Sequence, residues 1–482
     1  MAYFYRYLSA SLTQDERALR PARQLTRKLN SKLNAQLGTQ VIRNVAGLMC
    51  AALLNLATCS PNAVAAETLA QAWDVALARD HVFAAAHNRE LAGGYQVAAA
   101  QANYLPKITL ESGYLRTETE PAAKINLPAL AFLKGASLPF AQDSAYFGGV
   151  SIAAPLYTGG KISSGIAAAQ AQAEALQAKT EQTRSDLKLA IAQSYLAVLR
   201  ATHATSVAAS HIAAVSKHVS DVQALFDQGY VARHDLLASQ VALASAQQLG
   251  LQADNALALA KAGYNRWLGR AYDSRVEIVD IVDVVGTGTP TQQPAAGLAY
   301  LLNTATVQRK ELQELDRQGL AYQQQAASVA AGHLPQLGIS AGWSKLENRY
   351  LAEDKGWWVG IVMKWELFDG GLIRHQASQL TATAEAIHEM ALDTREKIAL
   401  QVRQAWLTQQ EANARMQLVR KATEQAEETL ALARERYRSG LAPNSDVLDA
   451  ETRRLQAFSN RDNAIYDREW ARLQLQYASG QL

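Results

Sequence analysis

Residues 149–160 read GVSIAAPLYTGG, and residues 360–371 read GIVMKWELFDGG. Each stretch alternates apolar residues with small or polar ones, and each ends in two glycines followed by a long run of helix-forming residues. The second stretch follows the first at an offset of 211 residues, and this offset holds without a gap from Gly149 to Gly269. The chain therefore contains one structural unit twice, and its parts are interpreted as symmetric pairs.

The repeat extends in both directions from these stretches. Downstream, the offset of 211 relates Phe226, Gly229, Asp235 and Gly269 to Tyr437, Gly440, Asp446 and Gly480. Upstream, an offset of 229 relates Leu69, Ala92, Leu105-Pro106 and Gly113 to Leu298, Ala321, Leu334-Pro335 and Gly342. The first copy thus carries 18 additional residues between Gly113 and Gly149. We expect them to lengthen a loop that contains three prolines.

Residues 1–66 have the pattern of a secretory signal region with an unusually long N-terminal extension. Basic residues precede an apolar run, Val45 to Thr58, and the small residues Ala63-Val64-Ala65-Ala66 predict cleavage after Ala66. An alternative is a lipoprotein, with Leu56-Ala57-Thr58-Cys59 as the lipidation sequence. Both cysteines lie in this region, and its removal leaves a net charge of about −3. This composition argues against a disulfide framework, thiol chemistry or a nucleic-acid partner.

Each copy has the pattern of a helix, a β-hairpin, a very long helix and a shorter helix. The first repeat, 67–270, contains a helix of about 69–103, a hairpin over 106–157, a long helix over 160–228 and a helix over 232–268. A linker over 271–297 precedes the second repeat, 298–482, with a helix of about 298–332, a hairpin over 335–368, a long helix over 371–439 and a helix over 444–479. Each long helix would extend roughly 100 Å, and the two shorter helices together match that length. We therefore expect the shorter helices to stack end to end beside the long one.

The strands are apolar on one face and small or polar on the other, as in outer-membrane β-strands. The returning strands show it most clearly, in Val150, Ile152, Ala154 and Leu156, and in Trp357, Val359, Ile361, Met363, Trp365 and Leu367. A soluble hairpin with one buried face is the alternative. No apolar run after residue 66 approaches the ~18 residues of a membrane-spanning helix. Four strands are too few to close a membrane barrel, so we expect three chains to supply twelve.

From the duplicated element order, the two Gly-Gly turns and the paired helical turns, the chain resembles the TolC family of outer-membrane channels. The resemblance covers about Glu67 to Leu482, and the segment from Tyr437-x-x-Gly440 to Asp446-Val447-Leu448-Asp449-Ala450 is especially similar to the family's second periplasmic turn. It implies an α+β, mainly α fold: a homotrimer with a twelve-stranded barrel in the lipid of the outer membrane and a helical barrel in the periplasm. The partners implied are a periplasmic adaptor and an inner-membrane pump of the RND or ABC type.

The resemblance also implies candidate site residues at the periplasmic entrance. A ring of aspartates narrows this entrance in the family, and the matching positions are Asp446 and Asp449. For Asp446 the competing interpretation is helix capping, which its repeat mate Asp235 would share. Asp449 does not need that role, because its mate is Ala238.

A second set of candidates would hold the entrance closed through contacts between the two turns, which are marked by Gly229 and Gly440. Tyr437 matches the family's tyrosine, and Asp235 matches one of its partners. The family's arginine is replaced by Ala442, and His234 stands in the place of the other partner. Nearby Arg233 and Arg438 are the candidates to replace that arginine. A weaker or differently built latch is therefore expected.

The sequence offers little for catalysis, metals or cofactors. His203, His211 and His218 share a helix face but lie more than about 10 Å apart, so we interpret them as surface or interhelix residues. Gly159-Gly160-Lys161 lacks the earlier glycine of a phosphate loop and is interpreted, like Gly370-Gly371, as a strand-to-helix turn. Charged residues also cluster late in the second long helix and predict a solvated face: Glu424, Glu427, Glu428, Arg434, Glu435, Arg436 and Arg438.

These observations predict a passive, non-enzymatic exit duct in the outer membrane of a Gram-negative cell, extending into the periplasm. Small-molecule efflux and type I protein secretion remain alternatives, because the sequence of the duct does not separate them. A periplasmic coiled-coil scaffold without a pore is the alternative from another class.

Overall fold

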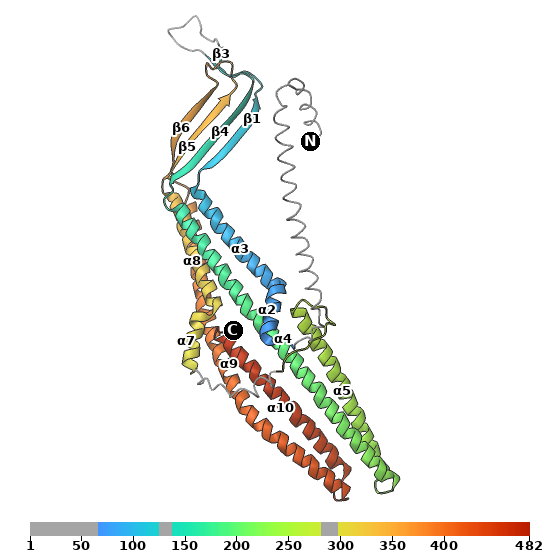
Figure 1. The fold of residues 1–482 in the computed structure, drawn as a ribbon. Helices are drawn as coiled ribbons and strands as arrows, with labels where there is room; N and C mark the ends of the chain where they lie inside the picture. Colours follow the sequence, from blue (N-terminus) through green and yellow to red (C-terminus); the bar gives the residue numbers. More distant parts are fainter. Residues whose placement is uncertain (1–65, 125–136, 281–296) are drawn as a thin grey trace, which may run out of the picture. The chain divides into compact units, whose positions relative to one another are not determined.

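The computed structural model describes residues 66–124, 137–280 and 297–482, which form helices and one principal sheet (Figure 1). The predicted signal region with Cys59, the middle of the first hairpin loop and most of the predicted linker lie outside these residues. Their elements belong to one compact unit, Glu67–Leu482. The first copy comprises α2 (Leu69–Arg79), α3 (His81–Gln101), β1 (Lys107–Arg116), β4 (Ser144–Tyr157), α4 (Lys161–Asp227) and α5 (Arg233–Trp267). The second comprises α7 (Leu298–Gln308), α8 (Lys310–Ala330), β5 (Gln336–Leu346), β6 (Lys355–Lys364), α9 (Leu372–Arg438) and α10 (Asn444–Ala478).

The helices of the two copies correspond residue for residue. The long helices α4 and α9 have 67 residues each, and α5 and α10 have 35 each. The remaining pairs have 11 and 21 residues, in α2 and α7 and in α3 and α8. The three shorter helices of each copy therefore contain as many residues as its long helix.

The first helix of each copy is broken in two, whereas the sequence pattern suggested one continuous helix. Asp80 has extended backbone angles, and its carboxylate accepts a hydrogen bond from the backbone N–H of Phe83 at 2.8 Å, so it caps α3. Arg309 occupies the equivalent break and is buried, with hydrogen bonds to Glu311 and to the carbonyl oxygen of Ala478. An aspartate cap and a buried arginine thus produce the same break in the two copies.

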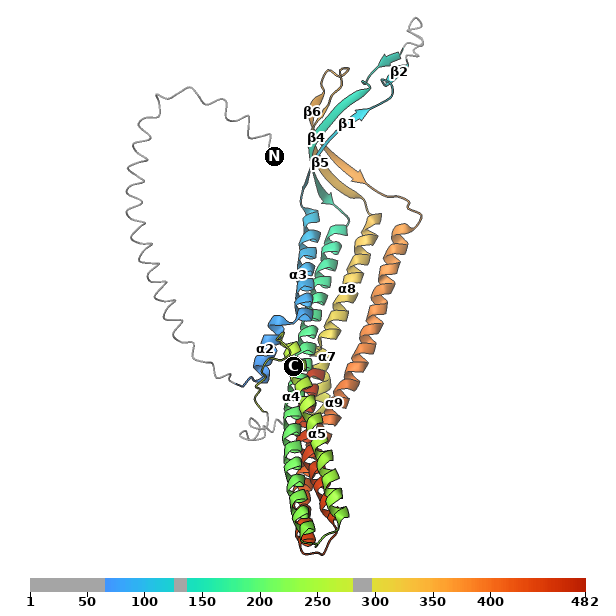
Figure 2. The same ribbon diagram turned by 90° about the vertical axis from the view of Figure 1, so that its right-hand side faces the viewer.

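The long helices form the centre of a helical wall. Below the sheet, α3, α4, α8 and α9 lie side by side in that order (Figure 2). Farther along, α5 packs on α4, and α10 packs on both α9 and α4. The junction between the shorter helices is sealed by apolar cores. One core joins Ala72 and Ala76 of α2 to Ile191 of α4 and Tyr264 of α5, and its counterpart joins Leu301 of α7, Val402 of α9 and Leu475 of α10.

The four main strands form one antiparallel sheet in the order β1-β4-β5-β6. The two hairpins are joined by β4 and β5, which pair from Phe147↔Leu346 to Tyr157↔Leu337 with an irregularity near Pro155. A short ribbon, β2 (Ala122–Lys124) and β3 (Ser137–Pro139), lies within the long first loop. Strand β6 ends at Lys364, so Trp365 and Leu367 follow the strand rather than belong to it. The indole N–H of Trp365 donates to the carbonyl oxygen of His333 there.

Two glycines connect each strand to its long helix. Gly159 and Gly160 have φ values of 62° and 91°, and Gly370 and Gly371 have values of 67° and 88°, which favour glycine strongly. Beyond this shared backbone the turns differ. Asp369 accepts hydrogen bonds from the backbone N–H groups of Gly371 and Ile373 and so caps α9, whereas α4 has no side-chain cap. These turns fix where the helical wall leaves the sheet.

Candidate functional site at the helical turns

The helices return at two tight turns, between α4 and α5 and between α9 and α10, which together we call the tip. Gly229 and Gly440 have φ values of 75° and 71°, and their N–H groups donate to the carbonyl oxygens of Phe226 and Tyr437 at 2.8 and 2.9 Å. Only glycine adopts this backbone easily, and it reverses the chain within a few residues. The tip therefore brings the ends of four helices into one region.

A buried hydrogen-bond network ties three of these helices together. Asn444 is 2% exposed at the start of α10, and its Oδ1 atom accepts a hydrogen bond from His218 Nε2 of α4 at 2.6 Å. Its amide nitrogen also donates to the carbonyl oxygen of Asp235 and to Ser239 Oγ of α5, both at 3.0 Å. Because buried polar groups are costly to leave unpaired, this network fixes the position of the second turn against the first copy.

Tyr437 is packed into this network without bonding to it. Its ring stands edge-on to His218 with 5.6 Å between the ring centroids. Its hydroxyl is buried and has no hydrogen-bond partner among the described residues. Burial raises the pKa of Tyr437, and the nearby charge of Asp235 adds to the effect. The residue therefore acts at the tip as a packed aromatic ring.

Two ion pairs also join elements at the tip. Arg438 of α9 binds Asp221 of α4 at 3.4 Å. Arg434 of α9 binds Glu451 of α10, whose side chain is 1% exposed. A cavity of about 30 Å³ lies between the helices and is bounded by Lys217, His218, Asp221, Leu225, Arg434, Tyr437 and Arg438. The predicted charge run is thus not wholly a solvated face, because Arg434 and Arg438 form contacts between helices.

The structure places the predicted entrance residues on the exposed first turns of α10. Asp446 and Asp449 are both exposed. Asp446 is not the N-cap, a position held by Pro443, and its carboxylate forms no hydrogen bond within the described residues. Asp446 therefore does not cap α10 through a hydrogen bond. It does lie in the first turn of this helix, where a carboxylate interacts favourably with the helix dipole.

The latch candidates are only partly brought together. Tyr437 lies close enough to Asp235 for the charge of that carboxylate to raise the pKa of the tyrosine. Arg438 instead pairs with Asp221 on α4. Arg233 and His234 are exposed at the start of α5 and make no ion pair or side-chain hydrogen bond among the described residues. Sequence reasoning missed the contacts made by Asn444, Ser239 and Glu451. The sequence did contain a sign of the Arg434–Glu451 contact. Both residues are charged, whereas their repeat mates, Gln223 and Gln240, are neutral.

One face of the sheet is mainly apolar, and the other carries mostly small or polar residues together with Phe147, Trp358 and Val362. The strand register places Ile108, Ile152, Ala341 and Val359 on the same face. Large apolar side chains on this face are open to solvent, with Trp357 at 85% exposure. Strands β1 and β6 each have one edge that pairs with no strand in the described part of the chain. Exposed apolar surface beside an unpaired strand edge is avoided in isolated soluble sheets.

Within residues 66–124, 137–280 and 297–482, no helix is long and apolar enough to cross a membrane. No group of three or more His, Cys, Asp or Glu side chains is placed there to hold a metal ion.

An apolar sheet continued by a wall of duplicated long helices is the fold of TolC-like outer-membrane channels. The model of the family described as outer membrane efflux protein matches residues 72–270 and 301–481. The chain belongs to that family, which confirms the resemblance predicted from its repeats and turns.

Individual relatives agree with this assignment. The chain is 27% identical over 265 residues to the alkaline protease secretion protein AprF of Pseudomonas aeruginosa. That match covers 52% of this chain and 53% of AprF, so the chain spans about half the length of this relative. The fold is similar to that of VceC from Vibrio cholerae, with a TM-score of 0.70, 18% identity and coverage of 86% and 96% of the two chains. It is also similar to the CmeC channel of Campylobacter jejuni, with a TM-score of 0.69, 15% identity and coverage of 86% and 85%. AprF is named as a secretion protein, VceC as an outer membrane protein and CmeC as an outer membrane channel.

Proposed function

We propose that this protein is the outer-membrane exit duct of a tripartite export system and has no enzymatic activity. It conducts substrates passively from a periplasmic adaptor and an inner-membrane pump to the outside. The observation that carries the proposal is the four-stranded sheet, which has an exposed apolar face and two unpaired edges. Such a sheet is stable in lipid only if both edges are paired.

A homotrimer satisfies this requirement. Pairing β1 of one copy with β6 of the next joins three sheets into a closed barrel of twelve strands. The helices support the same arrangement, because α3 and α9 are the outer members of the four-helix row beneath the sheet. The closed helical barrel would then extend the duct through the periplasm.

The trimer and the pore can be tested together. We expect outer-membrane fractions to contain a heat-resistant trimer, and the purified trimer to give discrete conductance steps in a planar lipid bilayer. A monomer in the soluble periplasmic fraction without conductance would instead establish the scaffold alternative.

Protein secretion has a specific observation in its favour as the substrate class, because AprF is named as an alkaline protease secretion protein. A deletion strain should be compared with its parent for the proteins in the culture medium and for susceptibility to a panel of drugs. Loss of a secreted protein with unchanged susceptibility supports type I secretion. Increased susceptibility with unchanged secretion supports efflux through an RND-type pump.

The exposed carboxylates of Asp446 and Asp449 are proposed to form the charged ring at the periplasmic entrance. Three copies would place six carboxylates around one axis and favour cations. Asp449→Ala introduces the residue of the first copy, and we expect it to lower the potassium-to-chloride permeability ratio. Asp254→Ala, an exposed position on α5, is the matched control. Equal ratios in both variants would rule out the ring.

The packing of Tyr437 on His218 and its nearness to Asp235 are proposed to hold the entrance closed. Tyr437→Ala should raise single-channel conductance, because it removes the ring that fills the space beside His218. Tyr437→Phe should change it little, because the hydroxyl forms no hydrogen bond among the described residues. Unchanged conductance in Tyr437→Ala and in Asp235→Asn would contradict a latch here.

A further inference from the structure

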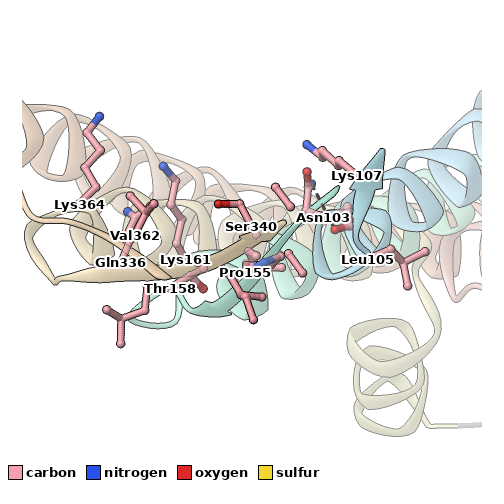
Figure 3. A pocket seen from close by; sticks show the side chains of 18 of the residues that line it. Asn103, Leu105, Lys107, Pro155, Thr158, Lys161, Gln336, Ser340, Val362 and Lys364 are labelled. Atoms are coloured by element: carbon pink, nitrogen blue, oxygen red, sulfur yellow. Dashed lines mark hydrogen bonds between the residues drawn. The ribbon is translucent and has the colours of Figure 1, made fainter. Parts of the chain in front are cut away.

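A concavity of about 790 Å³ lies where the sheet meets the helices (Figure 3). Its wall combines strand residues with the first turn of α4. Three lysines from three different elements line it: Lys107 of β1, Lys161 of α4 and Lys364 of β6. Its volume lies in the range of small-molecule sites in proteins.

The three lysines are exposed, and none takes part in an ion pair or side-chain hydrogen bond among the described residues. They extend to the same side of the strands in Figure 3. No aspartate or glutamate lines the concavity. Glu111, the acidic residue on this face of β1, lies four positions farther along the strand and does not line it. The concavity therefore carries three unneutralised positive charges.

The strand register shows which face of the sheet these lysines occupy. Lys107 is paired with Ala153, one position from the pair Ile108↔Ile152 on the apolar face. Lys364 is paired with Gln336, and its neighbour along the strand, the exposed Met363, lies on the apolar face. Because successive strand residues point to opposite faces, Lys107 and Lys364 lie on the face opposite the apolar one. In a barrel whose apolar face contacts lipid, that face lines the lumen.

The internal repeat shows that the fold does not require these charges. The repeat mates of Lys107, Lys161 and Lys364 are Gln336, Leu372 and Ala153. The mate of Thr158, which lines the concavity, is Asp369, which caps α9. Each lysine thus has a neutral counterpart at an equivalent position of the same fold. Two of the lysines belong to the first copy and one to the second, so both copies contribute positive charge to the concavity.

We propose that this concavity selects and transiently binds anionic groups, carboxylates or phosphates, of permeating substrates at the base of the barrel. The inference rests on the proposed duct, in which three copies supply nine lysines around the lumen. Such a ring raises the local concentration of anions and is strongest at low ionic strength, where charges are least screened.

The test compares the wild-type channel with a triple variant, Lys107→Gln, Lys161→Leu and Lys364→Ala, in which each lysine becomes its repeat mate. A control variant carries Lys124→Gln, Lys397→Gln and Lys421→Gln, which removes three exposed lysines elsewhere. Permeability ratios come from reversal potentials across a potassium chloride gradient in a planar bilayer. Inorganic pyrophosphate serves as a multivalent anion that should block the open channel.

At low salt we expect the triple variant to lower the chloride-to-potassium permeability ratio at least about twofold and to weaken pyrophosphate block, with the control unchanged. At about 1 M salt, where the Debye length is about 3 Å, the difference should disappear. A conducting triple variant with wild-type ratios and block would overturn this inference and leave the duct intact. Absence of conductance in the wild type would instead defeat the proposed function. If the triple variant does not assemble, Lys161→Leu alone is measured, with the same two outcomes at a smaller size.

Discussion

The two copies of the repeat have the same backbone but carry different charges. Their helices have equal lengths, and the glycines at equivalent turns share left-handed backbone angles. At the sheet, the first copy has Lys161 where the second has Leu372. At the tip, the second copy has Arg434 and Glu451 where the first has Gln223 and Gln240. Glycines and apolar contacts therefore maintain the shared geometry, and charge is placed where the copies need not be alike.

The difference in charge between the two copies should affect stability most at the tip. Glu451 is 1% exposed, and Arg434 is the side chain that it pairs with. One of the carboxylate oxygens has no hydrogen-bond partner among the described residues, so the pair already leaves the charge incompletely compensated. In the first copy, Gln223 bonds instead to Asp227 on its own helix. The second copy thus depends on an ion pair that the first copy lacks.

Removal of one partner of this pair should have the largest effect. Arg434→Gln leaves the Glu451 charge buried without its cation, and we expect a loss of about 3 kcal/mol in the free energy of unfolding. The purified protein can be compared with the wild type by thermal and denaturant unfolding at pH 7.5.

The double variant Arg434→Gln and Glu451→Gln tests the interpretation directly, because it gives the second copy both residues of the first. It should recover most of the lost stability, since an uncharged pair is far less costly to bury than a lone carboxylate. A double variant as unstable as Arg434→Gln would show that Arg434 acts through packing alone.

The strand-to-helix turns offer a smaller and well-matched comparison. Gly159 and Gly370 have nearly equal φ values, so alanine at either position should cost about 1 kcal/mol through its backbone angles. A Cβ atom at Gly159 would lie 2.6 Å from Cβ of Leu334, whereas one at Gly370 meets nothing within 4 Å. Gly159→Ala should therefore lose a further ~1–2 kcal/mol from overpacking. Equal melting temperatures for the two variants would contradict this difference.

The sequence predicted the family and the element order, because repeated glycines and alternating strands are local patterns that recur at a constant offset. It did not predict the breaks at Asp80 and Arg309. The first needs recognition of a cap inside a helical pattern, and the second depends on a buried contact to Ala478 far along the chain. The tip network was missed for the same reason. His218 and Asn444 meet only because α4 and α10 pack together across 226 positions of sequence.

The smallest expected effect is a dependence of stability on pH that arises from His211. This residue also differs between the copies, because its repeat mate is Ala422. Burial lowers the pKa of His211 below its ordinary value of about 6.5, Glu451 opposes the shift, and Arg454 reinforces it. Its Nδ1 atom is buried with no hydrogen-bond partner among the described residues. Below about pH 6.5 the unfolded chain binds a proton at this position more readily than the folded chain.

The stabilisation is therefore present above about pH 6.5 and is lost as the pH falls towards the lowered pKa of the folded state. His211→Gln removes the titrating group, and the other histidines contribute equally to both proteins. Between pH 7.5 and pH 5.5 the wild type should lose up to about 1 kcal/mol more stability than His211→Gln. A fall of equal size in both proteins would mean that His211 becomes charged as easily in the folded tip as in water. In that case Glu451, rather than burial, would control its protonation.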